Sequence, residues 1–65
     1  MRLKVNGSEQ DVAAATLAEA LEVLDYSGTV VATALNGSFV PAKVRRDTRL
    51  TDGDAIEIVA PKQGG

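Results

Sequence analysis

The residues with the clearest chemical potential are Gly64 and Gly65, which follow Pro61, Lys62 and Gln63 at the end of the 65-residue sequence. Neither glycine has a Cβ atom, so the pair can extend into a channel too narrow for other residues. The α-carboxylate of Gly65 is unreactive toward nucleophiles at neutral pH. It becomes reactive when another enzyme adenylates it with ATP, because AMP is then the leaving group. Gly65 is therefore the candidate reactive residue, and Gly64 and Gln63 form the tail that carries it.

Other reactive groups are scarce in this sequence. It has neither cysteine nor histidine, which removes thiolate chemistry and the commonest general base and metal ligand. Asp47, Asp52 and Asp54 lack the spacing of a calcium loop, which also needs a distal glutamate, and Asp52-Gly53-Asp54 is better interpreted as a turn. We expect no metal site, no bound cofactor and no catalytic residues, and hence a carrier or co-substrate rather than an enzyme.

The charge pattern narrows the class of partner. The formal net charge is −2, and an acidic balance argues against nucleic acid as the main partner. The basic cluster at Lys43, Arg45, Arg46 and Arg49 contains no aromatic residue on which a base could stack, so it is interpreted as a solvated loop. No apolar stretch approaches the length of a membrane span. We expect a soluble cytoplasmic protein that binds neither nucleic acid nor membrane.

The first half of the sequence predicts a hairpin and a helix. Residues 2–5 alternate polar and apolar, as in a strand, and Asn6-Gly7 is the strongest short hairpin signal. Residues 9–12 are the polar return strand, expected at a sheet edge. A capping box at Thr16-Leu17-Ala18-Glu19 then opens a helix of about two to three turns. Gly28 is interpreted as the residue that terminates this helix.

The second half of the sequence predicts another hairpin and a final strand. Residues 30–35 form an apolar strand, Asn36-Gly37 makes the turn, and the return strand is cut short by Pro41. Residues 43–49 are charged and are expected to be irregular. Residues 55–60 are apolar on both faces apart from Glu57, which places this last strand at the centre of the sheet.

These elements predict an α+β fold, in which one main helix covers one face of a mixed sheet of four to five strands. The first and last strands are expected to lie side by side and parallel, joined through the helix. This topology is the β-grasp, or ubiquitin-like, fold. The expected organisation is a β-grasp domain over residues 1–60 and a flexible tail over residues 61–65.

The whole chain resembles the ThiS family of small sulfur carriers of thiamine thiazole biosynthesis. The Asp-Gly-Asp turn and terminal Gly-Gly are shared with the related MoaD carriers, whereas the short length and the Gln-Gly-Gly ending favour ThiS. Ala42 departs from the pattern, since a basic residue often follows Val-Pro, and Thr33 is more polar than usual. The matching segments are Val5-Asn6-Gly7, the helix opening at residues 16–21, residues 31–37 leading into Val40-Pro41, residues 50–54, and Gln63-Gly64-Gly65.

The resemblance implies a specific set of partners. A ThiF-like adenylating enzyme would use ATP to convert the Gly65 carboxylate to an acyl-adenylate. Sulfur from the persulfide of a donor protein would replace AMP and leave a thiocarboxylate. Thiazole synthase (ThiG) would then take this sulfur to build the thiazole ring.

A docking surface for these partners follows from strand alternation. Side chains that point toward the helix are expected at Leu3, Val5, Ile56 and Ile58. The opposite, uncovered face of the sheet then carries four apolar side chains, which we interpret as a partner-docking surface: Val59, Ala32, Ala34 and Phe39.

Three other functions remain open from the sequence. A MoaD-like carrier for molybdopterin would use the same tail chemistry for a different client. A ubiquitin-like modifier would join Gly65 to a lysine through an isopeptide bond. A plain β-grasp binding module would carry Gly64-Gly65 incidentally.

Overall fold

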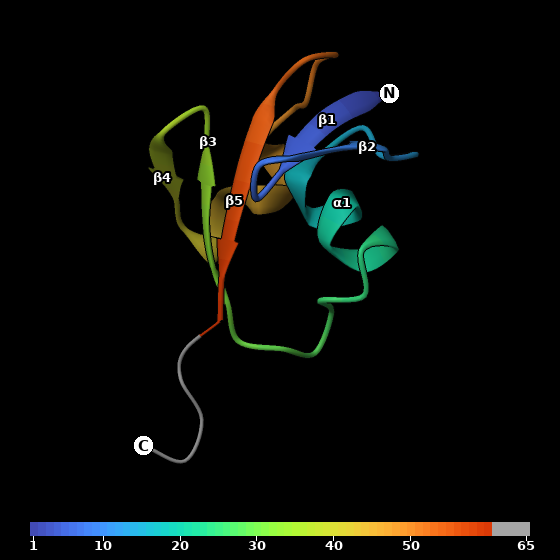
Figure 1. Ribbon diagram of the computed structural model, residues 1–65. Coiled ribbons are helices and arrows are strands. Elements are labelled where there is room, and N and C mark those ends of the chain that lie inside the picture. The colour runs from blue at the N-terminus through green and yellow to red at the C-terminus, as the bar shows by residue number, and fades with distance from the viewer. Residues whose placement is uncertain (61–65) are drawn as a thin grey trace.

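The computed structural model describes residues 1–60, and it has a five-stranded mixed sheet at its centre (Figure 1). The strand order is β2-β1-β5-β3-β4. β1 pairs with β5 in parallel, and the β1–β2, β3–β4 and β3–β5 pairs are antiparallel. The strands are β1 (Arg2–Val5), β2 (Ser8–Asp11), β3 (Ala32–Leu35), β4 (Ser38–Val40) and β5 (Ala55–Val59).

This architecture is the predicted β-grasp fold. The last strand occupies the middle of the sheet, and the first strand lies beside it in parallel, as expected. In Figure 1, β5 runs between β3 and β4 on one side and β1 and β2 on the other. Both Asn-Gly pairs form the predicted turns, since Asn6 and Asn36 adopt φ values of 49° and 50° and the following glycines adopt 86°.

The apolar core lies between one face of the sheet and α1 (Leu17–Val23). Leu3, Ile56 and Leu17 are each at most 1% exposed. Burying a leucine or isoleucine side chain of this kind stabilises the fold by about 1.5–3 kcal/mol. The inward positions predicted for Leu3, Val5, Ile56 and Ile58 are confirmed, because all four side chains are buried.

The start of α1 shows the predicted cap at Thr16, whereas Glu19 reaches back to the residue before the cap and not to the cap itself. Thr16 is the N-cap in extended conformation, and its hydroxyl accepts a hydrogen bond from the backbone N–H of Glu19 at 3.3 Å. The Glu19 carboxylate reaches back to accept from the N–H of Ala15 at 2.8 Å. Two N–H groups at the helix entrance are thus satisfied by side chains.

The end of α1 differs from the prediction that placed the terminator at Gly28. The helix ends at Val23, and Asp25 takes the left-handed conformation with φ of 69°. The backbone N–H groups of Tyr26 and Asp25 donate to the carbonyl oxygens of Leu21 and Glu22, which is the Schellman pattern. This position holds no glycine, but aspartate tolerates the left-handed region better than most residues. Gly28 lies in the loop that follows, at φ of 83°.

The segment expected to be irregular contains a 3₁₀ helix, η1 (Ala42–Asp47), so that prediction was wrong. Pro41 precedes η1 with φ of −64°, a value suited to the start of a helix. η1 packs against α1, and two backbone bonds fasten its exit: Leu17 N–H donates to Thr48 O and Leu50 N–H donates to Ala15 O. The smaller differences are at strand ends, since β3 begins at Ala32 and β5 ends at Val59.

The predicted tail, residues 61–65, lies outside the described residues, so its conformation stays a prediction. In residues 1–60, no helix combines the length and apolar character needed to cross a bilayer.

Candidate functional site

The sheet face that points away from α1 carries the four residues predicted to form the docking surface. Ala32 of β3 lies opposite Val59 of β5, and Ala34 of β3 lies opposite Phe39 of β4. Val59 and Phe39 are 63% and 69% exposed, Ala32 is exposed and Ala34 is half-buried. The four side chains are therefore neighbours on one open surface, which we call the open face.

The open face is hollowed because its side chains differ in size. The two alanines of β3 are short, whereas Val59 and Phe39 stand on the strands to either side. The resulting hollow has a volume of about 450 Å³. Glu57 is the ionisable residue in its lining, which consists of Asn6, Ala32, Thr33, Ala34, Phe39, Glu57 and Val59. A large exposed valine and phenylalanine around a shallow hollow fit a docking surface for another protein.

The position of Val59 links the open face to the tail. Val59 is the last residue of β5, and only Ala60 separates it from residues 61–65. A partner seated on the open face would therefore lie next to the point from which the tail departs. Gln63, Gly64 and Gly65 themselves fall outside the described residues, so their roles stay predictions.

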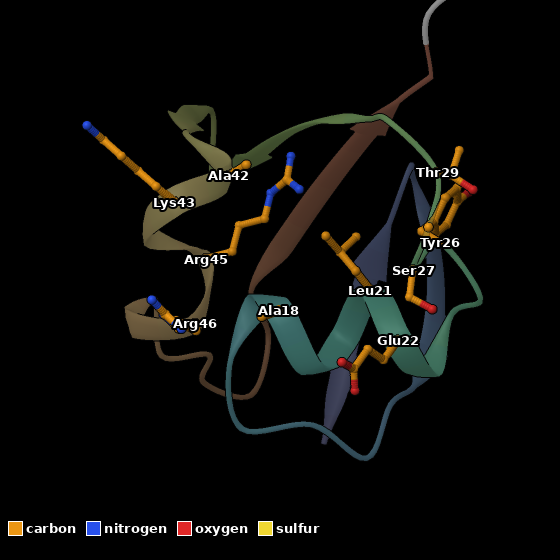
Figure 2. A pocket seen from close by; sticks show the side chains of 11 residues that line it. Ala18, Leu21, Glu22, Tyr26, Ser27, Thr29, Ala42, Lys43, Arg45 and Arg46 are labelled. Atoms are coloured by element: carbon orange, nitrogen blue, oxygen red, sulfur yellow. The ribbon is translucent and has the colours of Figure 1, made fainter.

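A second hollow, of about 390 Å³, lies between α1 and η1 (Figure 2). Its lining includes Lys43, Arg45 and Arg46, and Glu22 stands on the α1 side. Figure 2 shows Arg45 reaching inward, whereas Lys43 extends away from the hollow. The Arg45 guanidinium is already engaged, as Nε donates to Thr33 Oγ1 at 3.0 Å and Nη2 donates to Val31 O at 2.6 Å. The contacts of Arg45 are therefore structural, and Lys43 and Arg46 are the other basic residues that line this hollow.

The Asp54 carboxylate of the acidic turn is engaged in hydrogen bonds. It accepts from Asn36 Nδ2 at 3.0 Å, from Thr51 N at 2.8 Å and from Thr51 Oγ1 at 3.2 Å. The bond from Asn36, followed by those from Thr51, holds the pKa of Asp54 below its ordinary value. Within residues 1–60, no group of three or more acidic side chains gathers as a metal would require.

Two polar side chains with clear structural roles were missed from the sequence. Arg45 was assigned to a solvated loop, yet it satisfies the buried hydroxyl of Thr33. Thr33 was noted as unusually polar for its position, and a buried hydroxyl requires a partner, so this signal was available. Asn6 was assigned only to a turn, but its side chain also binds the backbone of β5.

Comparisons with known proteins agree with this fold over its full length. The model of the ThiS family matches residues 3–65. A crystal structure of the thiamine biosynthesis protein ThiS from Geobacter metallireducens is 32% identical and superposes with a TM-score of 0.83, covering all of both chains. A search of curated proteins found no match. On the family match and this full-length similarity, the chain belongs to the ThiS family.

Proposed function

We propose that this protein is a sulfur carrier of thiamine biosynthesis, and that Gly65 bears the transferred sulfur. The observation that carries the proposal is the family match, which extends through Gly64 and Gly65 as well as the β-grasp body. The Geobacter neighbour, a thiamine biosynthesis protein, supports the choice of pathway.

The proposed chemistry begins with activation of a carboxylate. An oxygen of the Gly65 carboxylate attacks the α-phosphorus of ATP on a ThiF-like enzyme, and pyrophosphate leaves. The product is an acyl-adenylate, in which AMP is a far better leaving group than oxide. The carrier supplies only the carboxylate, so it acts as a co-substrate, and the binding of ATP belongs to its partner.

Sulfur then replaces AMP at the same carbonyl carbon. The terminal sulfur of a donor persulfide attacks the carbonyl, AMP leaves, and an acyl disulfide joins the carrier to the donor. A second thiol attacks the donor's sulfur, so the S–S bond breaks, a disulfide forms on the donor, and the thiocarboxylate leaves with both electrons of that bond. Thiazole synthase (ThiG) would receive the sulfur from this thiocarboxylate. An oxygen atom from water or from the sulfur acceptor then replaces the sulfur on Gly65, which returns the carboxylate for another cycle.

The open face is the proposed docking surface for the adenylating enzyme. Val59, Ala32, Ala34 and Phe39 present apolar side chains to solvent around a hollow next to the base of the tail. A partner bound there would hold the body while the tail enters its nucleotide site, which raises the local concentration of the carboxylate. Glu57 in the same hollow favours a basic group on the partner surface.

The test is to incubate the protein with ATP, a ThiF-like enzyme and a persulfide donor, and to measure its intact mass. A shift equal to replacement of one oxygen by sulfur supports the carrier. Conjugates of higher mass with other proteins would instead indicate a modifier. Deletion of the gene should cause thiazole auxotrophy, whereas loss of molybdoenzyme activity would reassign the client to molybdopterin.

A further inference from the structure

The backbone of Ile58 near the end of β5 is paired on one side by a side chain instead of a strand. β1 stops at Val5, which lies opposite Ile56, and the chain then turns away at Asn6-Gly7. The backbone N–H and C=O of Ile58 face this same side of β5, because the polar groups of alternate residues point the same way. These two groups lie two residues beyond Ile56, which is the last residue of β5 that pairs with β1.

The Asn6 side chain fills the missing place in the ladder. Its Oδ1 accepts from Ile58 N at 2.8 Å, and its Nδ2 donates to Ile58 O at 3.2 Å. The primary amide has one acceptor and two donors, so it can reproduce both bonds that a peptide group would make. On the other side of β5, Val59 is paired with Ala32 of β3. The last two residues of β5 are thereby held from both sides.

Asn36 binds the backbone at the opposite end of β5 with its side-chain amide. It has nearly the same φ as Asn6, and its Oδ1 accepts from Ala55 N at 2.9 Å. Its Nδ2 donates to Asp54 Oδ1, and its backbone N–H donates to Ala55 O at 2.7 Å. The asparagines of the two Asn-Gly turns thus bind the backbone of β5 at its first residue, Ala55, and near its last, at Ile58. Of the two, only Asn6 lies near the end of β5 that residues 61–65 follow.

We propose that Asn6 is a positioning residue for the tail, which fixes the base from which the Gly65 carboxylate reaches its adenylating partner. This inference rests on the proposed function. Gly65 follows Ile58 by seven residues, a span of at most about 25 Å. With the open face docked, a fixed base confines the carboxylate to a smaller volume and so raises its concentration at the nucleotide. Releasing Ile58 increases the number of residues between Gly65 and the last fixed residue of β5 on this side, and so lowers that concentration.

The matched variants are Asn6→Gly and Asn36→Gly. Glycine accepts positive φ, so each turn is kept while each amide is removed. Both variants should lower the unfolding temperature by similar amounts. Only Asn6→Gly should accelerate amide hydrogen exchange at Ile58 and Val59. With a ThiF-like enzyme and ATP, it should also slow acyl-adenylate formation at saturating carrier by about three- to tenfold. Because Asn6 also lines the hollow of the open face, the dissociation constant of this variant is measured separately. The positioning role predicts that the rate defect persists at saturating carrier, where a change in affinity no longer affects the rate.

The outcomes separate this inference from the function on which it rests. Equal adenylation rates for the two variants at saturation would overturn the positioning role of Asn6, as would unchanged exchange at Ile58. A wild-type protein that is never adenylated would overturn the proposed function, and the role of Asn6 toward the tail with it. If Asn6→Gly unfolds at the assay temperature, Asn6→Asp replaces it. Aspartate tolerates the turn and keeps an acceptor for Ile58 N–H but has no donor for Ile58 O, and the same rate defect is expected.

Discussion

Arg45 and Thr33 form a polar contact beneath the sheet, on the face that packs against the helices. Thr33 is 2% exposed, its hydroxyl donates to Val40 O at 2.8 Å, and it accepts from Arg45 Nε at 3.0 Å. A second bond, from Arg45 Nη2 to Val31 O, ties the same guanidinium to the residue before β3. This relationship anchors η1 to the sheet. In the described part of the chain, every buried side-chain nitrogen and oxygen has a hydrogen-bond partner.

Removing Arg45 should therefore destabilise the fold. Arg45→Met keeps much of the apolar stem but leaves the Val31 carbonyl and the Thr33 hydroxyl without this donor, at a cost of about 1–3 kcal/mol. Arg46→Met is the control, since Arg46 is exposed and makes no side-chain hydrogen bond or ion pair within residues 1–60. Urea denaturation measures the free energy of unfolding of both variants. Equal decreases in this free energy would show that the contacts of Arg45 contribute nothing to stability.

Asp25 offers a stabilising substitution at the end of α1. Its φ of 69° strains a residue with a Cβ, whereas glycine adopts the left-handed region freely. Asp25→Gly should raise the free energy of unfolding by about 0.5 kcal/mol after the entropy of the unfolded chain is counted. Ser27→Gly, in the loop beyond, should give no such gain. A decrease in stability for Asp25→Gly would mean that its carboxylate contributes more than the backbone strain costs.

Asp54 should make stability depend on pH in acid. Its pKa is lowered in the folded protein, chiefly by the bond from Asn36, so the folded state favours the ionised form. The resulting stabilisation is fully present above the unfolded pKa, which is the ordinary aspartate value of 3.8, and is lost as pH falls through the lower folded pKa. The unfolding temperatures of wild type and Asp54→Asn should differ at pH 6 and become equal at lower pH. Asp47→Asn removes the same charge and serves as the control. A difference in unfolding temperature between wild type and Asp54→Asn that persists unchanged into acid would contradict this pH dependence.

Val59 tests the open face as a docking surface. Val59→Asp places a charge beside the hollow, and burying it against an apolar partner should weaken binding to the ThiF-like enzyme by at least about tenfold. Val30→Asp is the matched control, because Val30 is 78% exposed and lies outside the open face. Isothermal titration calorimetry measures both affinities. An unchanged affinity for Val59→Asp would remove the open face from the proposal.

The fold was largely predictable because its signals are local or depend on simple alternation. Asn6-Gly7 and Asn36-Gly37 require particular φ values wherever they lie, and the apolar pattern of residues 55–60 requires a central strand. Alternation alone also placed Val59 and Ala32 on the same face. These predictions needed no knowledge of which distant residues meet.

The features that escaped prediction depend on contacts between distant segments. η1 is polar and short, and the bonds of Arg45 to Thr33 and Val31 that hold it in place cannot be read from residues 43–49. The helix end was misplaced because the left-handed position fell on Asp25, whereas Gly28, three residues further on, is the stronger sequence signal for a helix end. The second role of Asn6 required knowing that β5 extends past the end of β1.

The most direct test of the central claim is the intact mass of the carrier after reaction with ATP, a ThiF-like enzyme and a persulfide donor. Wild type should gain the mass that replaces one oxygen by sulfur, and fragmentation should place the change at Gly65. A variant with one alanine added after Gly65 should keep its unfolding temperature and gain no sulfur, because its carboxylate follows a side chain that a channel shaped for Gly-Gly would exclude. Sulfur uptake by the extended variant, or none by wild type, would contradict the claim that the Gly65 carboxylate is the working group.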